Sequence, residues 1–343
     1  MRVLTHKSPD LLLDTKDWRI VQEIVTNIRQ PISQIAKNIL LSRQSVEYRL
    51  KKMQENKLLI GSRTVINNSK LGFRSFHVFI EVHTPKEEKI ILDRATKAPF
   101  VNAIIIYSGK YNLEISIMAK SQEEFLDYYH EITKNVRIRN DIILTLLNGL
   151  RSEVLPSDHF PKLKKIGETF SEPVRKGKKD RKVDLQKNDL KILYSLSKDA
   201  QITNTKLARE IGVSKDTIKY KINQLEKENY IIQYRPVVNY SVLGLSINSL
   251  LIKTNYIPED IKKFENLMKE HKSILWATKT YGYYNYVVYV ITKDLEEFHE
   301  VINVLKGSFE DLIKTYEILF AFQELKYNFM AKSISDNFSN NTS

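Results

Sequence analysis

Two different rhythms of apolar and polar residues follow one another along the chain. Residues 14–56 place apolar side chains three and four positions apart, the spacing that puts them on one face of a helix. Trp18, Val21 and Ile24 mark the first of these helices. From residue 76 to 147 the rhythm changes to alternating or continuous apolar runs, which are typical of strands, separated by two helical stretches. The pattern therefore predicts an α+β fold.

The order of the predicted elements is more specific than their types. The first part predicts three helices and then a strand, a tight turn and a second strand, over 14–27, 32–39, 42–56 and 58–66. The second part predicts strand, helix, strand, strand, helix, strand, over 76–82, 85–97, 101–108, 111–119, 122–134 and 141–147. That order is the split-βαβ, or ferredoxin-like, αβ-sandwich arrangement. The same order recurs later, over 249–254, 258–271, 274–281, 284–291, 295–305 and 315–323.

The recurrence is read as a tandem duplication of one unit. Asp17-Trp-Arg-Ile-Val aligns with Asp189-Leu-Lys-Ile-Leu at an offset of 172, which holds as far as the Leu-Gly pairs that begin at Leu71 and Leu243. One inserted residue then changes the offset to 173. A unit of roughly 140 residues is domain-sized and too long for a solenoid repeat.

The duplication sets the expected domain boundaries. We expect helical domains at 10–70 and 184–243, αβ-sandwich domains at 71–152 and 244–330, a linker at 153–183 and a disordered tail at 331–343. Residues 162–182 of the linker hold nine basic and three acidic side chains without apolar periodicity. Such a segment is a solvated spacer or a contact to phosphate.

The third predicted helix of each copy carries a mixed basic, amide and aromatic outer face. With Val46 in the core, Leu50 and Met53 fall on the same side, and Ser42 and Ser214 supply oxygens that cap the first turn. Three short helices followed by strand, turn and strand make a winged helix-turn-helix, whose third helix enters the DNA major groove. The expected DNA contacts are Ser42, Arg43, Gln44, Ser45, Tyr48, Lys51, Lys52 and Arg63, and Ser214, Lys215, Asp216, Thr217, Tyr220 and Arg235.

The two predicted reading helices are not equivalent. Gly212 stands before the second of them, where a left-handed turn residue is expected, but the first copy has Leu40 there. A left-handed leucine costs about 1 kcal/mol, so the first turn is either strained or differently built. Gln44 is matched by Asp216, which repels phosphate and favours a cytosine amino group. We therefore expect two unlike half-sites rather than a strict palindrome.

Strand composition indicates that the sheets pair. Residues 103–106 and 142–147 are apolar on both faces, whereas helices cover only one face of an αβ-sandwich sheet. We expect the free faces to meet, within one chain or between chains as a homo-oligomer. The alternative is short strands that are fully buried without any oligomer.

Composition narrows the partners and the chemistry. Lys and Arg number 54 against 41 acidic residues, a net charge of +13, which favours a polyanionic partner. The absence of cysteine excludes disulfides, thiolate zinc sites and cysteine nucleophiles. There is no apolar run of about 20 residues and no apolar signal core, so we expect a soluble cytoplasmic protein without a membrane partner.

With these elements in this order, the chain resembles the Lrp/AsnC (feast/famine) family of transcription regulators. The resemblance rests on Leu13-Asp14-x-x-Asp17, on the Ile-Ala to Arg-Leu core of residues 35–50, on the Leu-Gly after the wing and on the Gly-x-Tyr-Asn turn. The second copy departs from the motif at Gln186 and at Lys221. The resemblance implies a sequence-specific, double-stranded-DNA-binding regulator that assembles through its αβ-sandwich domains, although most members carry one copy per chain.

The resemblance also implies a small-molecule effector such as an amino acid. In the family, the turn after the second strand of the sheet lies near the effector pocket and often reads Gly-x-Tyr-Asp. The corresponding residues here are Gly109, Tyr111 and Asn112, and Gly282, Tyr284 and Asn285. Asparagine removes a negative charge that could meet an ammonium group. The alternative is a tight hairpin whose glycine permits positive φ.

Two other functions remain open. Siroheme decarboxylases share this architecture, but they depend on histidine and arginine around the effector-domain strands. The strands that flank Gly109 and Gly282 contain no histidine, and the chain's seven histidines are scattered. We therefore expect no catalytic residues, no metal and no cofactor. The other alternative is a non-specific nucleoid-associated protein.

Overall fold

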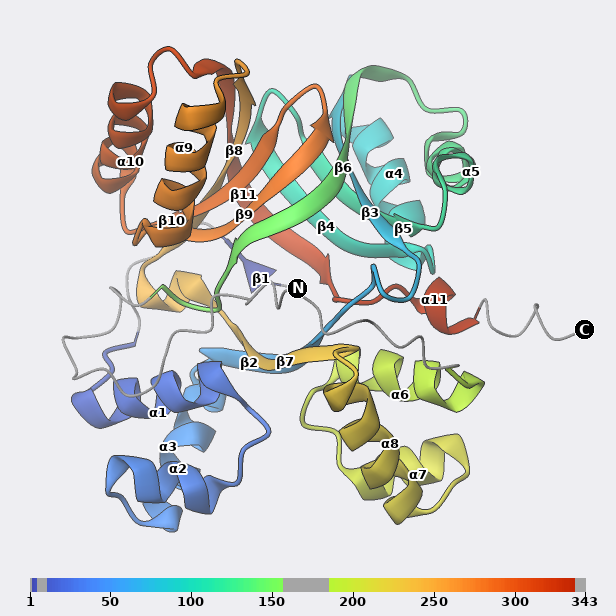
Figure 1. Cartoon of the computed structure of the whole chain (residues 1–343), viewed down its shortest axis with the longest axis vertical. Helices are drawn as coiled ribbons and strands as arrows, with labels where there is room; N and C mark the ends of the chain where they lie inside the picture. The colour runs from blue at the N-terminus through green and yellow to red at the C-terminus, as the bar shows by residue number, and fades with distance from the viewer. Residues whose placement is uncertain (1, 5–10, 157–184, 337–343) are drawn as a thin grey trace, which may run out of the picture.

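The computed structural model describes residues 2–4, 11–156 and 185–336 (Figure 1). Most of the predicted linker lies outside the described residues. The helices are α1 Thr15–Thr26, α2 Ile32–Ile39, α3 Arg43–Glu55, α4 Pro85–Lys97, α5 Gln122–Thr133, α6 Lys187–Lys198, α7 Asn204–Ile211, α8 Lys215–Lys227, α9 Pro258–Glu270, α10 Leu295–Ser308 and α11 Lys332–Asp336, with a 3₁₀ turn η2 at Tyr240–Leu243. The strands are β1 Arg2–Val3, β2 Leu59–Ile66, β3 Arg74–Val82, β4 Val101–Gly109, β5 Leu113–Ala119, β6 Ile138–Ser152, β7 Ile231–Val238, β8 Ser246–Thr254, β9 Ile274–Gly282, β10 Tyr286–Thr292 and β11 Ile313–Tyr327.

The α+β prediction is confirmed. Each half contains three short helices, then a strand, and then the order strand, helix, strand, strand, helix, strand. The 3.6-residue and 2-residue rhythms located these elements because each buries one side against the rest of the molecule. Within the described ranges, no helix is both long enough and apolar enough to span a membrane.

The two αβ halves join into one closed barrel. The sheet order is β1-β11-β4-β5-β3-β6-β9-β10-β8, and β11 also pairs with β8, so the eight strands other than β1 form a ring. The long strands β6 and β11 make the joints, since β6 pairs with β3 of its own half and β9 of the other. Likewise, β11 pairs with β8 of its own half and with β4. The expected pairing of the sheets is therefore made within one chain.

Alternation along the strands explains why they are apolar on both faces. On β3, Val78 and Ile80 face the core under α4 and α5, while Phe79 points into the barrel. On β4, Ile104 and Ile105 divide in the same way. In Figure 1, α4 and α5 cover one side of the barrel and α9 and α10 the other. On β3 and β4, one face packs on helices and the other fills the barrel.

The predicted wing is wrong. Residues 59–66 form the single strand β2, and in place of a hairpin partner β2 pairs antiparallel with β7 of the other half. Gly61, at φ +155, accompanies a register shift and does not turn the chain back. The strand stays extended because it is paired with β7 along its length, and α6 packs on β2 as α1 packs on β7. This two-stranded ribbon lies between the barrel and the two helical domains (Figure 1).

The prediction of a disordered tail is wrong for its first part. Residues 332–336 form α11, which packs against α6 of the second helical domain. Ile334 is buried there, and the Ser333 amide donates to the Pro99 carbonyl at 2.9 Å. The rest of the predicted tail, 337–343, lies outside the described residues.

Candidate nucleic-acid interface

Each half presents one helix, α3 or α8, whose inner side is buried and whose outer side faces solvent. Val46 and Ile218 are fully buried at matching positions, whereas Tyr48 and Tyr220, two residues later, are 68% and 69% exposed. The two exposed tyrosines thus stand at the same position of the two helices. We name the three-helix domains reading head 1 (α1–α3) and reading head 2 (α6–α8).

The predicted serine caps are present. The Ser45 amide donates to Ser42 Oγ at 3.1 Å, and the Thr217 amide donates to Ser214 Oγ at 3.0 Å. Each cap satisfies one of the free amides that a helix start leaves open. The caps fix where α3 and α8 begin, and therefore which side chains stand in their first turn.

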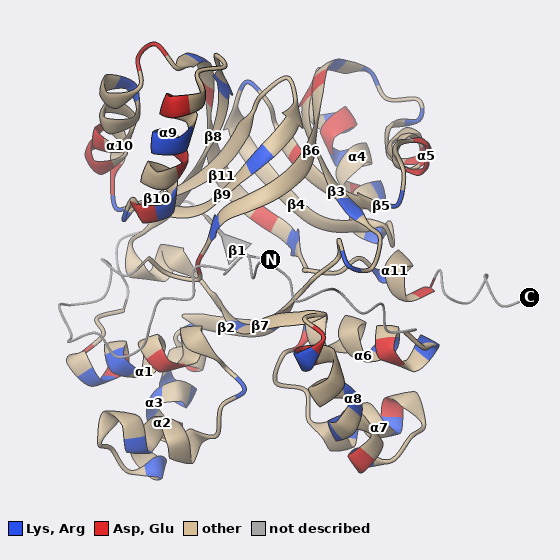
Figure 2. Cartoon of the chain, viewed as in Figure 1, with Lys and Arg blue, Asp and Glu red and all other residues tan. Residues whose placement is uncertain are grey.

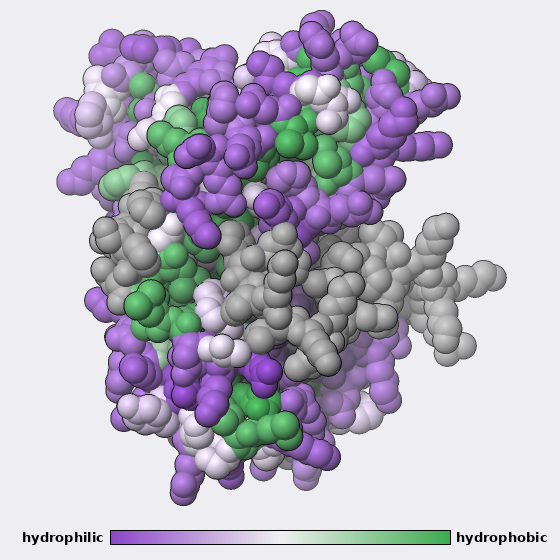
Figure 3. All heavy atoms as spheres, turned by 90° about the vertical axis from the view of Figure 1, so that its left-hand side faces the viewer, coloured by the Kyte–Doolittle hydropathy of each residue, from purple (hydrophilic) through white to green (hydrophobic). Residues whose placement is uncertain are grey.

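The turns before the two reading helices have the same shape despite their different residues. Gly212 ends α7 at φ 80 and ψ 38, and Leu40 ends α2 at φ 58 and ψ 47. Both lie in the left-handed region, so Leu40 bears the strain that the sequence indicated. The leucine side chain is 88% exposed and gains little from burial. Figure 3 shows hydrophobic atoms at the lower end of the molecule, where reading head 1 lies.

An ion pair fastens each reading helix to the first helix of its head. Arg49 Nη1 donates to Asp17 Oδ1 at 2.7 Å and to Asp14 Oδ2 at 2.8 Å. Hydrogen bonds to Asp17 and Asp14 raise the pKa of Arg49. Burial alone would raise the pKa of Asp14, but bonds from the Asp17 amide and from Arg49 outweigh it and lower that pKa. This ion pair therefore fixes how α3 is rotated about its own axis relative to α1.

The two residues of the second half that depart from the motif, Gln186 and Lys221, contact each other. Lys221 Nζ lies 2.8 Å from Asp189 Oδ1 and donates to Gln186 Oε1 at 3.3 Å. Lys221 and Gln186 occupy the positions of Arg49 and Asp14 in the first half. Lys221 and Gln186 thus make the same kind of contact as Arg49 and Asp14, and this contact holds α8 against α6.

The exposed faces of the reading helices hold most of the predicted DNA contacts. On α3 these are Arg43, Gln44, Tyr48, Lys51 and Lys52, and on α8 they are Lys215, Asp216 and Tyr220, with Ser45 and Thr217 half-buried. Glu47 lies 2.8 Å from Arg43, and Glu55 lies 3.7 Å from Lys51. Figure 2 shows Lys and Arg on both heads with acidic residues among them.

One candidate was missed by the sequence analysis. Lys219 is exposed on α8 at the position that Glu47 occupies on α3. The reversal of charge was visible in the aligned halves, because Glu47 and Lys219 are 172 residues apart. Head 1 therefore carries a carboxylate that pairs with Arg43, while head 2 carries a further cation there.

The prediction that Arg63 and Arg235 contact DNA is wrong. They lie opposite each other on the β2–β7 ribbon, and Arg63 Nη1 donates to the carbonyl of Lys198 at the end of α6. Arg235, 5% exposed, donates to Ser152 Oγ at 2.8 Å and to its carbonyl at 2.9 Å. Arg63 donates to the Tyr327 carbonyl at 3.1 Å. Ser152 and Tyr327 end β6 and β11, so the arginines fasten the ribbon to the barrel, an environment that a single sequence does not reveal.

The predicted effector residues have structural contacts. Tyr111 and Tyr284 are buried inside the barrel, and Asn112 Oδ1 accepts from the Val82 amide at 3.0 Å. Asn285 Oδ1 accepts from the Thr254 amide at 2.9 Å in the same way. Each asparagine thus ties its hairpin to the neighbouring strand. Burial, and then the charge of a nearby carboxylate, raises the pKa of Tyr111 to about 12.

The glycines of these turns allow the two halves to approach. A Cβ on Gly282 would lie 2.5 Å from the Ile143 carbonyl oxygen, and one on Gly109 would lie 3.1 Å from that of Ile318. Both carbonyls belong to the joint strands β6 and β11. The tight-hairpin alternative therefore has a direct physical basis at these six positions, in the seams of the barrel.

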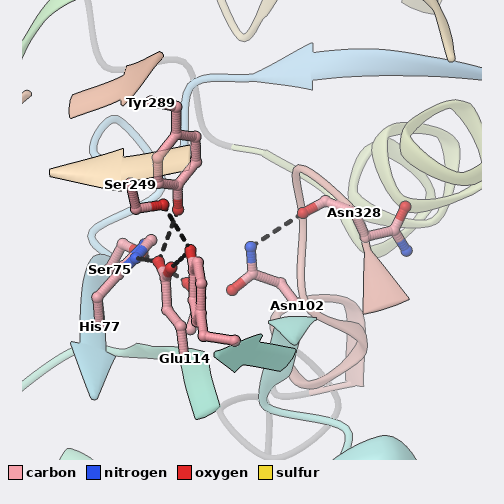
Figure 4. Close-up of polar contacts among 9 residues, drawn as sticks. Ser75, His77, Asn102, Glu114, Ser249, Tyr289 and Asn328 are labelled. Atoms are coloured by element: carbon pink, nitrogen blue, oxygen red, sulfur yellow. Dashed lines mark hydrogen bonds and ion pairs between the residues drawn. The ribbon is translucent and has the colours of Figure 1, made fainter. Parts of the chain in front are cut away.

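A buried polar network lies inside the barrel (Figure 4). Glu114, 2% exposed, accepts from Tyr107 at 2.5 Å and from Tyr289 at 2.7 Å, and lies 2.5 Å from His77 Nδ1. Tyr107 also bonds Ser249 at 2.8 Å. Burial and then the charge of Glu114 raise the pKa of both tyrosines well above 10. Tyr289 and Ser249 come from the second half, so this network, which the sequence analysis missed, joins the halves.

Comparison with known proteins identifies the reading heads independently. Residues 13–54 match the AsnC-type helix-turn-helix domain, and residues 185–232 match a winged helix-turn-helix DNA-binding domain. Residues 250–330 match the Lrp/AsnC ligand binding domain. The HTH-type transcriptional regulator Ptr1 of Methanocaldococcus jannaschii is 30% identical over 115 residues, which cover 33% of this chain and 75% of that protein. The chain belongs to the Lrp/AsnC family.

Other relatives agree with this family. The proline dehydrogenase transcriptional activator of Rhizobium radiobacter is 28% identical over 121 residues, covering 35% of this chain and 78% of that protein. These relatives are Lrp/AsnC-type regulators, and they span less than half of this chain. The crystal structure of the siroheme decarboxylase NirDL matches 94% of this chain and 97% of its own at a TM-score of 0.62, with 14% identity. At that identity the likeness shows a shared fold.

Proposed function

We propose that this Lrp/AsnC protein is a sequence-specific transcriptional regulator that reads duplex DNA with two non-equivalent helices, α3 and α8. One observation carries the proposal: in both heads the reading helix is fastened by an ion pair and capped by a serine, while its tyrosine stands exposed. A helix held this firmly, with its readout face open, suits insertion into the major groove.

The arrangement of the halves supports reading by a single chain. A helix-turn-helix protein reads two half-sites when two heads are held at a fixed separation. Here the ribbon and the closed barrel join both heads within one polypeptide. The sheet pairing that led us to expect a homo-oligomer is complete inside the chain, so the proposed DNA-binding unit is one chain.

Differences between the heads support two unlike half-sites. At matching positions α3 carries Gln44 and Glu47, and α8 carries Asp216 and Lys219. An amide side chain suits adenine, whereas a carboxylate accepts from the amino group of cytosine. A strict palindrome would satisfy only one of these faces.

The test is selection from a library of duplexes with a randomised centre, followed by fluorescence anisotropy on the selected duplex. We expect an enriched, non-palindromic sequence, with log affinity falling against log salt at a slope of roughly −0.9 per phosphate contacted. Tyr48→Ala and Tyr220→Ala should each weaken binding to the selected duplex by ~1–3 kcal/mol.

The matched control is Tyr256→Ala, because Tyr256 is 86% exposed but lies outside both heads, between β8 and α9. This variant should bind as wild type does. Salt-insensitive binding, or equal loss in all three variants, would count against the proposal. Equal competition by random duplex would favour the non-specific nucleoid-associated alternative instead.

Support for the remaining expectations is uneven. The match of residues 250–330 to a ligand binding domain supports a small-molecule effector, for which an amino acid is the proposed class. The six hairpin residues are occupied in structural contacts, which favours the tight-hairpin alternative at these positions. The likeness to NirDL is one of fold, and the Glu114 network is enclosed by protein partners, so neither observation favours a decarboxylase.

A further inference from the structure

The side chain of Arg29 makes direct hydrogen bonds from reading head 1 to reading head 2. The turn between α1 and α2 lies beside the turn between α6 and α7 (Figure 1), and Arg29 crosses from the first to the second. Its Nη1 donates to the Ala200 carbonyl at 2.9 Å and to the Ile202 carbonyl at 3.3 Å. Its Nη2 donates to Asn204 Oδ1 at 3.1 Å. The guanidinium fork thus holds three acceptors of head 2.

Arg29 is itself held in place. Its backbone amide donates to Asn27 Oδ1 at 2.8 Å, and its guanidinium lies 5.2 Å from the ring centroid of Tyr234 on β7. The Tyr234 hydroxyl donates to Glu226 Oε1 on α8 at 2.5 Å. A continuous set of contacts therefore runs from the end of α1, through Arg29, to the reading helix of the other head.

The contact is one-sided. The position of Arg29 is occupied in the second half by Gln201, whose backbone amide donates to Ser62 Oγ at 3.2 Å. Gln201 therefore supplies no second guanidinium across the junction. A rigid, planar fork with charge-assisted bonds constrains both distance and angle, which a flexible or neutral side chain does not.

We propose that Arg29 is a positioning residue that fixes the separation and relative rotation of α3 and α8, and thereby the half-site spacing that the chain accepts. The part concerning DNA rests on the proposed function. The part concerning the heads does not, since it follows from contacts within the protein. Loss of Arg29 leaves every predicted DNA contact in place and removes these hydrogen bonds between the heads. The contacts of each head to the ribbon remain, such as Gln233 Nε2 to the Val25 carbonyl and Ser62 Oγ to Asp199 Oδ1.

The first test measures the heads without DNA. The chain has no cysteine, so Lys37→Cys on α2 and Arg209→Cys on α7 give one labelling site on each head. Both positions are exposed and lie outside the predicted DNA contacts. Pulsed electron paramagnetic resonance between spin labels at these sites should show a broader or shifted distance distribution in Arg29→Gln, which places the second half's residue in the first. Asn204→Ala should change it in the same direction.

The matched control is Arg94→Gln. Arg94 also donates from Nη1 to two backbone carbonyls, of Ile132 and Lys134, but both lie within the first half. Its loss should leave the head-to-head distances unchanged. If Arg29→Gln leaves the distribution unchanged while the chain remains folded by circular dichroism, the positioning role is wrong.

The second test uses the duplex selected by wild type, with one to ten base pairs inserted between the half-sites. Wild type should bind the selected spacing best. In Arg29→Gln, the ratio of the affinity for the selected spacing to the affinity for other spacings should fall roughly tenfold. A wild-type chain that selects no duplex would refute the proposed function, together with the half-site part of this inference. An unchanged spacing profile in Arg29→Gln would refute the inference alone.

Discussion

At the scale of single residues, several side chains are used differently from what their type suggests. Arginines are common on nucleic-acid-binding surfaces, yet Arg235 donates hydrogen bonds to Ser152 and Arg29 donates to the other head. Both find carbonyl or hydroxyl oxygens more than 80 residues away in the chain. No periodicity in the sequence indicates such acceptors, which is why the sequence analysis placed Arg235 on DNA and did not single out Arg29.

Leu40 offers the most direct stability measurement at this scale. Leu40→Gly should raise the free energy of unfolding by about 1 kcal/mol, because it removes left-handed strain from an exposed residue. Gly212→Leu should lower it by a similar amount, since a Cβ at Gly212 meets no neighbour within 4 Å and only strain is added. Urea denaturation of the two variants measures both effects. Destabilisation by Leu40→Gly would show that this turn is not strained.

At the scale of elements, the sequence predicted what depends on local periodicity. The three helices expected in the first half and the six elements expected in each αβ-domain follow from runs of apolar residues, and α2 has the predicted bounds. The prediction of a wing failed because a Gly-Ser pair between apolar residues is as compatible with a bent strand as with a turn. What decided the outcome was β7, a partner more than 160 residues away. Likewise, β1 was not expected, because two residues carry no measurable pattern.

The network around Glu114 gives a test of how the halves are joined. Glu114→Gln keeps the shape but replaces one acceptor oxygen with an amide donor, which then faces a tyrosine or histidine donor. We expect a loss of roughly 2 kcal/mol in the free energy of unfolding. Glu131→Gln on the exposed side of α5 is the control and should change stability by less than about 0.5 kcal/mol. Equal effects in urea denaturation would show that the network contributes nothing specific.

At the scale of the whole molecule, ring closure is the feature that the sequence could not supply. Strands apolar on both faces indicated that the sheets pair, but not whether the partner is the same chain. The pairing of β6 with β9 and of β11 with β4 answers this, because both seams lie within one polypeptide. The barrel, the ribbon and Arg29 then hold two unlike heads in one fixed arrangement.

This design predicts a marked loss of stability at alkaline pH. Burial raises the pKa of many tyrosines, with nearby carboxylates adding to it in most: Tyr107, Tyr111, Tyr129, Tyr234, Tyr284, Tyr286 and Tyr289. In the unfolded chain they ionise near pH 10, whereas in the folded chain they keep their protons to higher pH. The unfolded state therefore binds fewer protons above about pH 10, and stability falls as pH rises through the folded pKa values.

Urea midpoints at pH 8, 9.5 and 11 measure this dependence. Each such tyrosine removes up to about 1.4 kcal/mol per pH unit above pH 10. Little change is expected from these groups between pH 8 and 9.5. Absorbance of tyrosinate should show that most of these side chains ionise together with unfolding. A midpoint that is the same at pH 11 as at pH 8 would show that the buried tyrosines are not protected.

The central claim is that one chain reads an asymmetric DNA site with two heads. Hydroxyl-radical footprinting of the selected duplex, at a stoichiometry fixed by native mass spectrometry, tests it most directly. The account predicts one chain per duplex, protecting two unlike half-sites about one helical turn apart. Two chains on a palindrome, or protection of a single half-site, would contradict it.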